Sequence, residues 1–257
     1  EQLRLTVALS VPAIVTQLSA IVMQYIDAAM VGSLGANASA SIGLVSTTTW
    51  LFWGLCAAAS TGFSVQVAHR IGADDWDCAR SILRRSVPST FAFSALLAAI
   101  GVSVSGALPQ WLGGDSAIRS DASLYFLIFS LFLPILQMNF LAAGMLRCSG
   151  NMRIPSIAGI LMCILDVVFN FFLIFPSREF SAGGLTLSIP GAGLGVQGAA
   201  LGTGLAESVA AAITLWYLFT RSSGLKIKAW RKSPSLPTPP IVRNSCLLYT
   251  SPSPRDG

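Results

Sequence analysis

The stretch Ala122–Leu146, ASLYFLIFSLFLPILQMNFLAAGML, contains no Asp, Glu, Lys or Arg. Its 25 residues exceed the ~20 mostly apolar residues that a helix needs to cross a bilayer. Lipid offers no hydrogen-bond partner to the backbone of an isolated strand, so a spanning segment of this kind must be helical. The stretch therefore predicts a transmembrane helix, and the rest of the chain repeats its pattern.

Charged residues are rare along the first 220 residues, and the gaps between them define further spans. The six predicted spans are Val7–Val31, Ile42–Val67, Ser86–Leu108, Ala122–Leu146, Ile154–Pro176 and Val196–Phe219. The whole chain is 53% hydrophobic and 11% charged, against about 25% charged residues in an average soluble domain. This composition excludes a soluble domain and a disordered chain. It predicts an all-α membrane protein, a six-transmembrane-helix bundle.

The basic residues indicate the orientation of these spans. With the N-terminus placed in the cytoplasm, the inner segments hold thirteen Lys and Arg residues, and the outer loops hold two, Arg119 and Arg178. Such a bias is the positive-inside pattern of a multi-pass membrane protein. The net charge of +5 therefore reports topology and contact with the lipid bilayer, and we expect no nucleic-acid partner.

Composition also divides the chain into regions. Residues 1–220 form the predicted transmembrane lobe, and the polar, Pro-rich residues 221–243 are typical of a cytoplasmic linker. Residues 244–257 are expected to be a non-native tail, because CLLYTSPSPRD at 246–256 resembles the translation of a sequencing adapter. The chain also begins at Glu1 without a methionine, so we expect a fragment of a longer protein.

Three acidic residues, Asp27, Asp166 and Glu207, fall inside predicted spans. A charge at the bilayer centre costs about 2.5–3.5 kcal/mol on insertion scales, and such acids usually mark an ion or substrate path. The alternative is a protonated acid that only bonds neighbouring helices, and this interpretation stays open for each acid taken alone. This alternative is weaker for Asp27 and Asp166 than for Glu207.

Each acid has polar neighbours at helical spacing on its own face. These neighbours are Gln17 and Gln24 with Asp27, Asn170 with Asp166, and Thr203 and Thr214 with Glu207. No Lys or Arg lies inside a span to pair with the acids. A pocket shared by the three helices would be negative when deprotonated, which favours protons, Na⁺ or organic cations and disfavours anions.

Proline and glycine mark two further features. Pro12 lies 15 residues before Asp27, and a proline inside a helix frees a carbonyl and bends the helix. Pro12 is therefore a candidate hinge, with a static packing kink as the alternative. Gly198 and Gly202 form a G-x-x-x-G pattern, which predicts close approach of a second helix. The run Pro190–Gly198 is interpreted as an outer turn that leads into the sixth span.

Several motifs, in this order and spacing, resemble the N-terminal half of the multidrug and toxic compound extrusion (MATE) family. They are Val11-Pro12, Gln17, Ile26-Asp27 and Met30–Gly35 in and after the first span, Gly62–Asp74 after the second, Leu146–Pro155 after the fourth, Asp166–Phe175 in the fifth and Gly193–Gly198 before the sixth. The resemblance extends over residues 1–220.

This resemblance implies one lobe of a 12-helix antiporter in a bacterial-type plasma (inner) membrane, with a C-terminal lobe to follow. Such an antiporter exports cationic, amphipathic compounds in exchange for Na⁺ or H⁺ and needs no other cofactor. Carried over, the cation-coupling residues are Asp27, Asp166, Asn170 and Thr203. If the ion is Na⁺, then Asp27, Asp166 and Asn170 are its metal ligands. Many family members place the amide before the acid on the fifth helix, whereas here Asp166 comes first.

Three alternatives remain. A lipid-linked oligosaccharide flippase of the same superfamily would need basic residues inside the spans for its anionic cargo, and the sequence has none there. A half-size channel or carrier would be complete with six helices. A membrane enzyme is not expected, because no His cluster, nucleophile elbow or metal spacing is present. Gln17, Gln24 and Glu207 are retained as cavity-lining candidates.

Overall fold

The computed structural model describes residues 2–182, 185–222 and 224–225. Residues 226–257, which include most of the predicted linker and the whole predicted tail, lie outside the described residues. The elements in chain order are α1 (Gln2–Gly32), α2 (Ala36–Gly72), α3 (Trp76–Val104), α4 (Leu108–Trp111), α5 (Ser116–Cys148), α6 (Arg153–Ile174), β1 (Pro176–Ala182), β2 (Leu185–Ala192) and α7 (Val196–Thr220).

Six of these helices, all except α4, are long and apolar enough to cross a membrane, which confirms the predicted six-helix bundle. Their ends differ from the predicted spans where a helix continues beyond its apolar part. α3 begins at Trp76 rather than Ser86, because the Asp75 carboxylate accepts a hydrogen bond from the Cys78 amide and caps the helix there. Its first turns carry Arg80, Arg84 and Arg85 outside the apolar segment.

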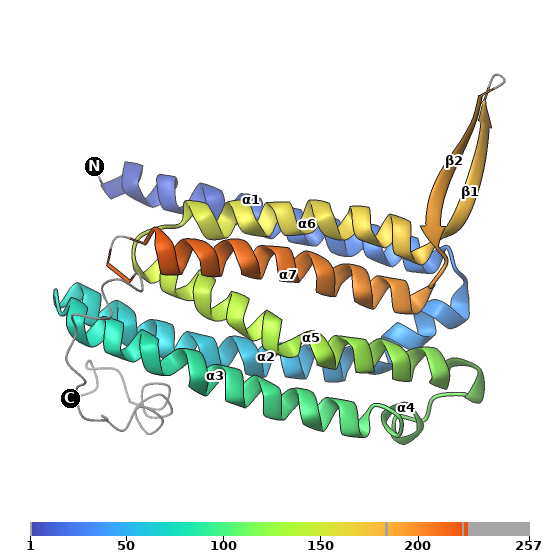
Figure 1. Ribbon diagram of the computed structural model, residues 1–257, viewed down its shortest axis with the longest axis horizontal. Helices are drawn as coiled ribbons and strands as arrows, with labels where there is room; N and C mark the ends of the chain where they lie inside the picture. Colours follow the sequence, from blue (N-terminus) through green and yellow to red (C-terminus); the bar gives the residue numbers. More distant parts are fainter. Residues whose placement is uncertain (1, 183–184, 223, 226–257) are drawn as a thin grey trace.

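The helices lie side by side along one long axis (Figure 1). The start of α1, the α2–α3 turn, the α5–α6 turn and the end of α7 gather at one end of the bundle (left in Figure 1). The α1–α2 turn, α4 and the β hairpin lie at the other end. The segments predicted to be cytoplasmic therefore meet at a single end, as a positive-inside topology requires.

α5 lies at the centre of the bundle and packs against α2, α3 and α7. Near the arginine-rich end, one core cluster joins these four helices through Val67, Leu83, Leu141 and Leu218. A second cluster around the Phe126 ring joins α2, α3 and α5 nearer the other end. The central group of helices is thus α2, α3, α5 and α7, and α6 packs against α7.

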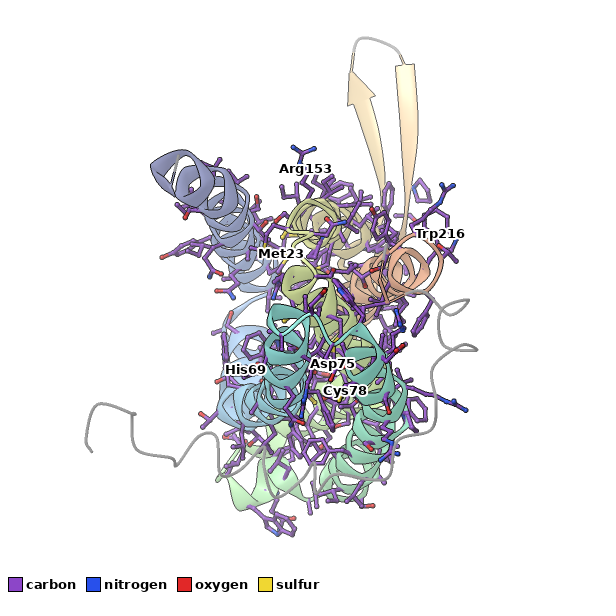
Figure 2. The ribbon with its side chains drawn as sticks, turned by 90° about the vertical axis from the view of Figure 1, so that its left-hand side faces the viewer. Met23, His69, Asp75, Cys78, Arg153 and Trp216 are labelled. Carbon is purple, nitrogen blue, oxygen red and sulfur yellow. The ribbon has the colours of Figure 1, made fainter. Side chains whose placement is uncertain are left out.

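α1 stands apart from this unit, and its contacts are chiefly with α6. Figure 2 looks along the helices from the arginine-rich end and shows α1 set away from α2 and α3, with Met23 on the side toward α6. At the opposite end, Val31 of α1 joins Ala38, Ile174 and Val196 in a small apolar cluster. α1 is therefore held by this apolar cluster at one end and by its contacts with α6.

The structure adds an antiparallel hairpin, β1 and β2, that the sequence did not predict. Pro190 belongs to β2, so the predicted turn Pro190–Gly198 is corrected to a shorter one around Gly193 and Gly195, whose φ angles are 64° and 56°. Glycine adopts such positive φ values without strain. The amides of Gly193 and Gly195 donate to Phe175 O at 2.9 Å and Ile174 O at 3.1 Å. The turn thereby satisfies the last carbonyls of α6 and fixes where α7 begins beside it.

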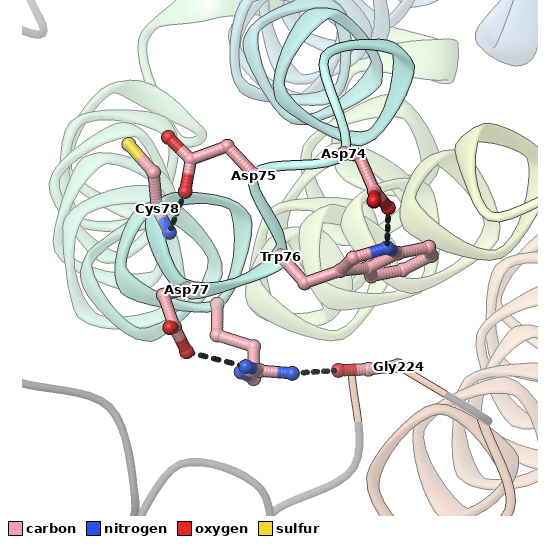
Figure 3. A network of polar contacts seen from close by, with 7 residues as sticks. Asp74, Asp75, Trp76, Asp77, Cys78 and Gly224 are labelled. Carbon is pink, nitrogen blue, oxygen red and sulfur yellow. Dashed lines mark hydrogen bonds and ion pairs between the residues drawn. The ribbon is translucent and has the colours of Figure 1, made fainter.

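The residues after α7 fold back onto the α2–α3 turn (Figure 3). Arg80 Nη1 donates to the Gly224 carbonyl at 3.2 Å, and the Trp76 ring packs against Gly224. Trp76 Nε1 donates to Asp74 Oδ1 at 2.9 Å, which fixes the indole. Leu225 is fully buried in the core cluster of this end. The packed lobe therefore continues to Leu225, five residues past the predicted boundary at 220.

Candidate functional site

Two of the three predicted membrane acids meet through one amide. Asn170 Nδ2 donates to Asp27 Oδ1 at 2.9 Å and to Asp166 Oδ2 at 3.2 Å. Asp166 and Asn170 lie one helical turn apart on α6, and Asp27 comes from the facing side of α1. The structure therefore brings Asp27, Asp166 and Asn170 together, as the sequence predicted.

The site is closed to its surroundings on the α6 side. Asp166 and Asn170 are 0% and 1% exposed, whereas Asp27 is half-buried. Asp166 Oδ1 and Asn170 Oδ1 are buried and accept no hydrogen bond. A buried polar atom without a partner is costly, so these two oxygens favour a ligand that accepts their lone pairs. Carboxylate and amide oxygens suit a proton or a hard cation such as Na⁺.

Thr203 of α7 joins the same site. Its side chain lies close to the Asp166 carboxyl, and its hydroxyl donates to the Ala199 carbonyl at 3.1 Å. Unlike its neighbours on α6, Thr203 is exposed, because one side of it lines a cavity. Thr203, the fourth predicted coupling residue, therefore lies between the Asp27–Asp166 pair and a cavity.

Two glycines allow α7 to come this close to α6. A Cβ at Gly198 would lie 2.6 Å from the carbonyl carbon and oxygen of Leu173, and a Cβ at Gly202 would collide with Asn170 Oδ1. The G-x-x-x-G pattern is thus a packing surface, as predicted. Gly202 also leaves the room that the Asn170 amide occupies, so the same pattern shapes the site.

Glu207 does not join the Asp27–Asp166–Asn170 site but forms a second polar network. Asn139 Nδ2, from α5, donates to Glu207 Oε1 at 2.7 Å, and Asn139 Oδ1 accepts from the Thr214 hydroxyl at 2.9 Å. Glu207 is 7% exposed. The shared polar face of Glu207 and Thr214 was predicted from their spacing, but the residue that connects them, Asn139, was not.

Glu207 and Thr203 border one cavity of about 180 Å³. Its walls come from five helices and include four aromatic rings: Trp53 from α2, and Tyr125, Phe129 and Phe132 from α5. Met23 of α1 closes one side. The cavity is therefore apolar with one acid, and Thr203 connects it to the Asp27–Asp166–Asn170 site.

The remaining predicted residues lie elsewhere. Gln17 and Gln24 are exposed on α1 and do not border this cavity, and their role as cavity-lining residues stays a prediction. α1 continues as one helix through Pro12, whose role as a hinge stays a prediction.

Sequence reasoning missed Asn139 and the aromatic walls. Asn139 lies in the charge-free stretch Ala122–Leu146, and a search for charged residues does not detect a neutral amide there. Gln137 and Asn139 are the two amides of that stretch, and an amide in a membrane helix is itself a signal of a polar contact. Gln137 donates to Ser60 Oγ of α2 at 2.7 Å, and Asn139 donates to Glu207 Oε1.

Comparison with known proteins gives consistent relationships. The MatE family model matches residues 12–172. The chain is 25% identical over 215 residues to the "Probable multidrug resistance protein NorM" of Thermotoga maritima, covering 84% of this chain and 44% of that protein. It is 22% identical over 227 residues to the "FAD transporter" of Shewanella oneidensis, covering 88% and 48%. The chain thus spans about half the length of the curated relatives it matches.

A solved structure shares the fold. It is the outward-facing conformation of a multidrug resistance MATE family transporter of the MOP superfamily, with a TM-score of 0.79 and 21% identity, over 94% of this chain and 50% of that one. The named relatives are transporters or a resistance protein and not enzymes, in agreement with the expectation that this chain is no enzyme. Because the family model covers more than half of the residues, the chain belongs to the MATE (MatE) family.

Proposed function

We propose that this chain is the N-terminal, cation-coupled lobe of a secondary antiporter. The antiporter exports cationic, amphipathic compounds in exchange for Na⁺ or H⁺ and contains a second lobe of the same chain. One observation carries the proposal: a single amide, Asn170 Nδ2, bonds acids on two different membrane helices. A cation that enters there acts on α1 and α6 together.

The proposed mechanism follows from the charges at this site. Two carboxylates that share one donor repel each other when both are ionised, and a proton or Na⁺ between them removes the repulsion. Asp27 links α1 to α6, and the rest of α1 packs chiefly on the same helix. Binding and release of the cation therefore change how α1 packs on α6, with Pro12 as the hinge. Exchange further requires that drug and ion weaken each other's binding.

We also propose the placement in the membrane. The end of the bundle that holds the α2–α3 and α5–α6 turns faces the cytoplasm, with the N-terminus, and the hairpin end faces outward. The support is the arginine content of those turns, to which Arg147 and Arg153 belong. A bacterial-type plasma membrane is the location that fits the family's named relatives.

An anionic cargo is a weaker candidate. One relative is named an FAD transporter, and FAD carries a pyrophosphate. An oligosaccharide flippase would likewise carry a pyrophosphate-linked lipid. None of the residues that border the Thr203–Glu207 cavity is basic, and the cavity holds an acid. The charge of the described lobe therefore favours cations.

The experiment is dye efflux from proteoliposomes that contain the complete protein to which this chain belongs, with Na⁺ and pH gradients imposed separately. We expect efflux with one of the two gradients and its loss in Asp27→Asn, at unchanged membrane insertion. Asp74→Asn is the matched control, because it removes a carboxylate in the α2–α3 turn at the arginine-rich end and keeps an acceptor for Trp76 Nε1. Gradient-driven efflux of normal rate in Asp27→Asn contradicts the proposal.

A further inference from the structure

A groove between α2 and α5 has no part in the proposed exchange. Its volume is about 760 Å³, and it reaches the arginine-rich end of the bundle, where His69 and Arg147 border it. We propose that this groove binds an anionic phospholipid of the cytoplasmic leaflet, with the phosphate at Arg147 and one acyl chain along the groove. This inference uses the proposed orientation in the membrane, but it does not depend on the antiport.

The basic end of the groove suits a phosphate. Arg147 of α5 and His69 of α2 are both exposed and approach it from different helices. Arg147 makes no ion pair with any residue that the structure describes, and the ion pairs at this end use Arg70 and Arg80 instead. None of the described residues that border the groove is acidic. Because a guanidinium binds a phosphate through two parallel hydrogen bonds, Arg147 is suited to hold a lipid phosphate.

The rest of the groove suits an acyl chain. Val65 and Ala68 of α2 line it beyond the basic end, and Phe140 of α5 lines it on the other side. Trp53 is the bordering residue of α2 that lies farthest from His69 along the helix. Its ring meets that of Phe140 edge to face, with 5.1 Å between the ring centroids. The groove is therefore charged at one end and apolar along its length.

The hydroxyl groups inside the groove are already bonded. Thr61 donates to the Ala57 carbonyl at 2.8 Å, and Ser64 donates to the Ser60 carbonyl at 2.9 Å. Ser60 Oγ in turn accepts a hydrogen bond from Gln137 at 2.7 Å. These polar groups therefore do not require a polar ligand, and a hydrocarbon chain can lie beside them without leaving them unsatisfied.

The length of the groove matches one leaflet of a membrane. Trp53 and His69 are 16 residues apart on α2, which is about 24 Å at 1.5 Å per residue. One leaflet with its headgroups measures roughly 20–22 Å, half of a bilayer about 40–45 Å thick. The predicted spans Ile42–Val67 and Ala122–Leu146 end just before His69 and Arg147, so both basic residues lie at headgroup level. A phospholipid fits this length, whereas a small soluble anion would use only the basic end.

Native mass spectrometry of the complete protein in detergent measures this binding. The probes are dioleoylphosphatidylglycerol, which is anionic, dioleoylphosphatidylcholine, which is zwitterionic, and glycerol phosphate without acyl chains. We expect phosphatidylglycerol to bind at least about tenfold more tightly than either of the others. Arg147→Gln should remove most of this preference. Arg153→Gln is the matched control, because Arg153 is exposed at the same end, lies away from His69 (Figure 2) and does not border the groove.

Thr61→Trp tests the apolar part of the groove without a change of charge. Thr61 is exposed and borders the groove, so a tryptophan there occupies the space of the acyl chain. The affinity for phosphatidylglycerol should fall at least about tenfold. Leu55→Trp is the control on the same helix, because Leu55 is 40% exposed and does not border the groove. It should bind this lipid like the wild type.

Four outcomes overturn the inference. Equal affinity for the two phospholipids does so, and so does an equal loss in Arg147→Gln and Arg153→Gln, which would report only the general positive charge of this end. Glycerol phosphate that binds as tightly as phosphatidylglycerol would make the ligand a soluble anion. Unchanged binding in Arg147→Gln or in Thr61→Trp would show that the lipid binds elsewhere and that another part of the protein covers the groove. Failure of gradient-driven efflux, by contrast, contradicts the proposed antiport and leaves this lipid site unaffected.

Discussion

Asn170 of α6 and Asp27 of α1, 143 residues apart in the chain, are joined by a 2.9 Å hydrogen bond from amide to carboxylate. The bond is a polar link between a helix that stands apart and the rest of the bundle. The same amide also bonds Asp166, so α1 is tied to the residue that a coupling cation would neutralise. The position of α1 is therefore connected to the charge of the Asp27–Asp166–Asn170 site.

Replacement of Asn170 by Ala should weaken Na⁺ binding about tenfold or more if Na⁺ is the coupling cation, because it removes the unpartnered Oδ1 as a ligand. If the coupling cation is H⁺, the expected sign is opposite. The amide donates to both carboxylates and so favours their ionised form, and its loss should strengthen proton binding. The measurement is titration of the complete protein with Na⁺ and, separately, proton release on drug addition.

Asn139→Ala is the matched control for that variant. It deletes the same side chain in the same lobe, but from the Glu207 network. We expect it to leave the affinity for the coupling cation within about threefold of the wild type, a change below 1 kcal/mol. Equal losses in both variants would show a general defect of the lobe rather than a role of Asn170.

The six membrane helices could be predicted from the sequence because their signal is local. A gap in charge such as Ala122–Leu146 reports the lipid around a helix, whatever that helix packs against. The hairpin gave no such signal. Residues 176–192 contain Pro190 and several glycines, and their pairing depends on a turn that rests on the end of α6.

The site was predictable to the extent that membrane acids are rare. Asp27, Asp166 and Asn170 were grouped correctly because each acid had to face a polar interior. Spacing along one helix could not reveal that Glu207 accepts a hydrogen bond from Asn139, 68 residues away on α5.

Gly198→Ala should destabilise the lobe by about 1–3 kcal/mol, the usual cost of overpacking. The added methyl would meet the Leu173 carbonyl at 2.6 Å, and a backbone atom does not move aside as a side chain does. Gly43→Ala on α2 is the control with the opposite sign. No atom lies within 4 Å of its Cβ position, and Ala is favoured over Gly in a helix by up to about 1 kcal/mol. Thermal unfolding in detergent compares the two, and equal shifts contradict the packing argument.

Leu225→Ala should lower the stability of the arginine-rich end by about 2–5 kcal/mol. Leu225 is fully buried beside Leu83 and Leu218, and its neighbour Gly224 is held by Arg80. Loss of that anchor should release the segment after α7, which trypsin reports as faster cleavage at Arg221. Leu124→Ala removes a leucine that is 38% exposed on α5 and serves as the control. Unchanged cleavage in Leu225→Ala would mean that Leu225 does not anchor the segment.

The cap of α5 should make stability fall at low pH. Asp115 accepts a hydrogen bond from the Ala117 amide at 3.2 Å, and this bond, with that of the Ser116 hydroxyl, holds the pKa of Asp115 below its ordinary value of 3.8. A carboxyl whose pKa is lowered by folding stabilises the folded state above its unfolded pKa. That contribution is complete above pH 3.8 and disappears as the pH falls through the lower folded value. Asn also caps helices but does not titrate, so Asp115→Asn should remove this part of the pH dependence and keep the cap. Unfolding temperatures of both proteins between pH 3 and 6 check this: the curves should converge at the acid end, and parallel curves would show that Asp115 makes no such contribution.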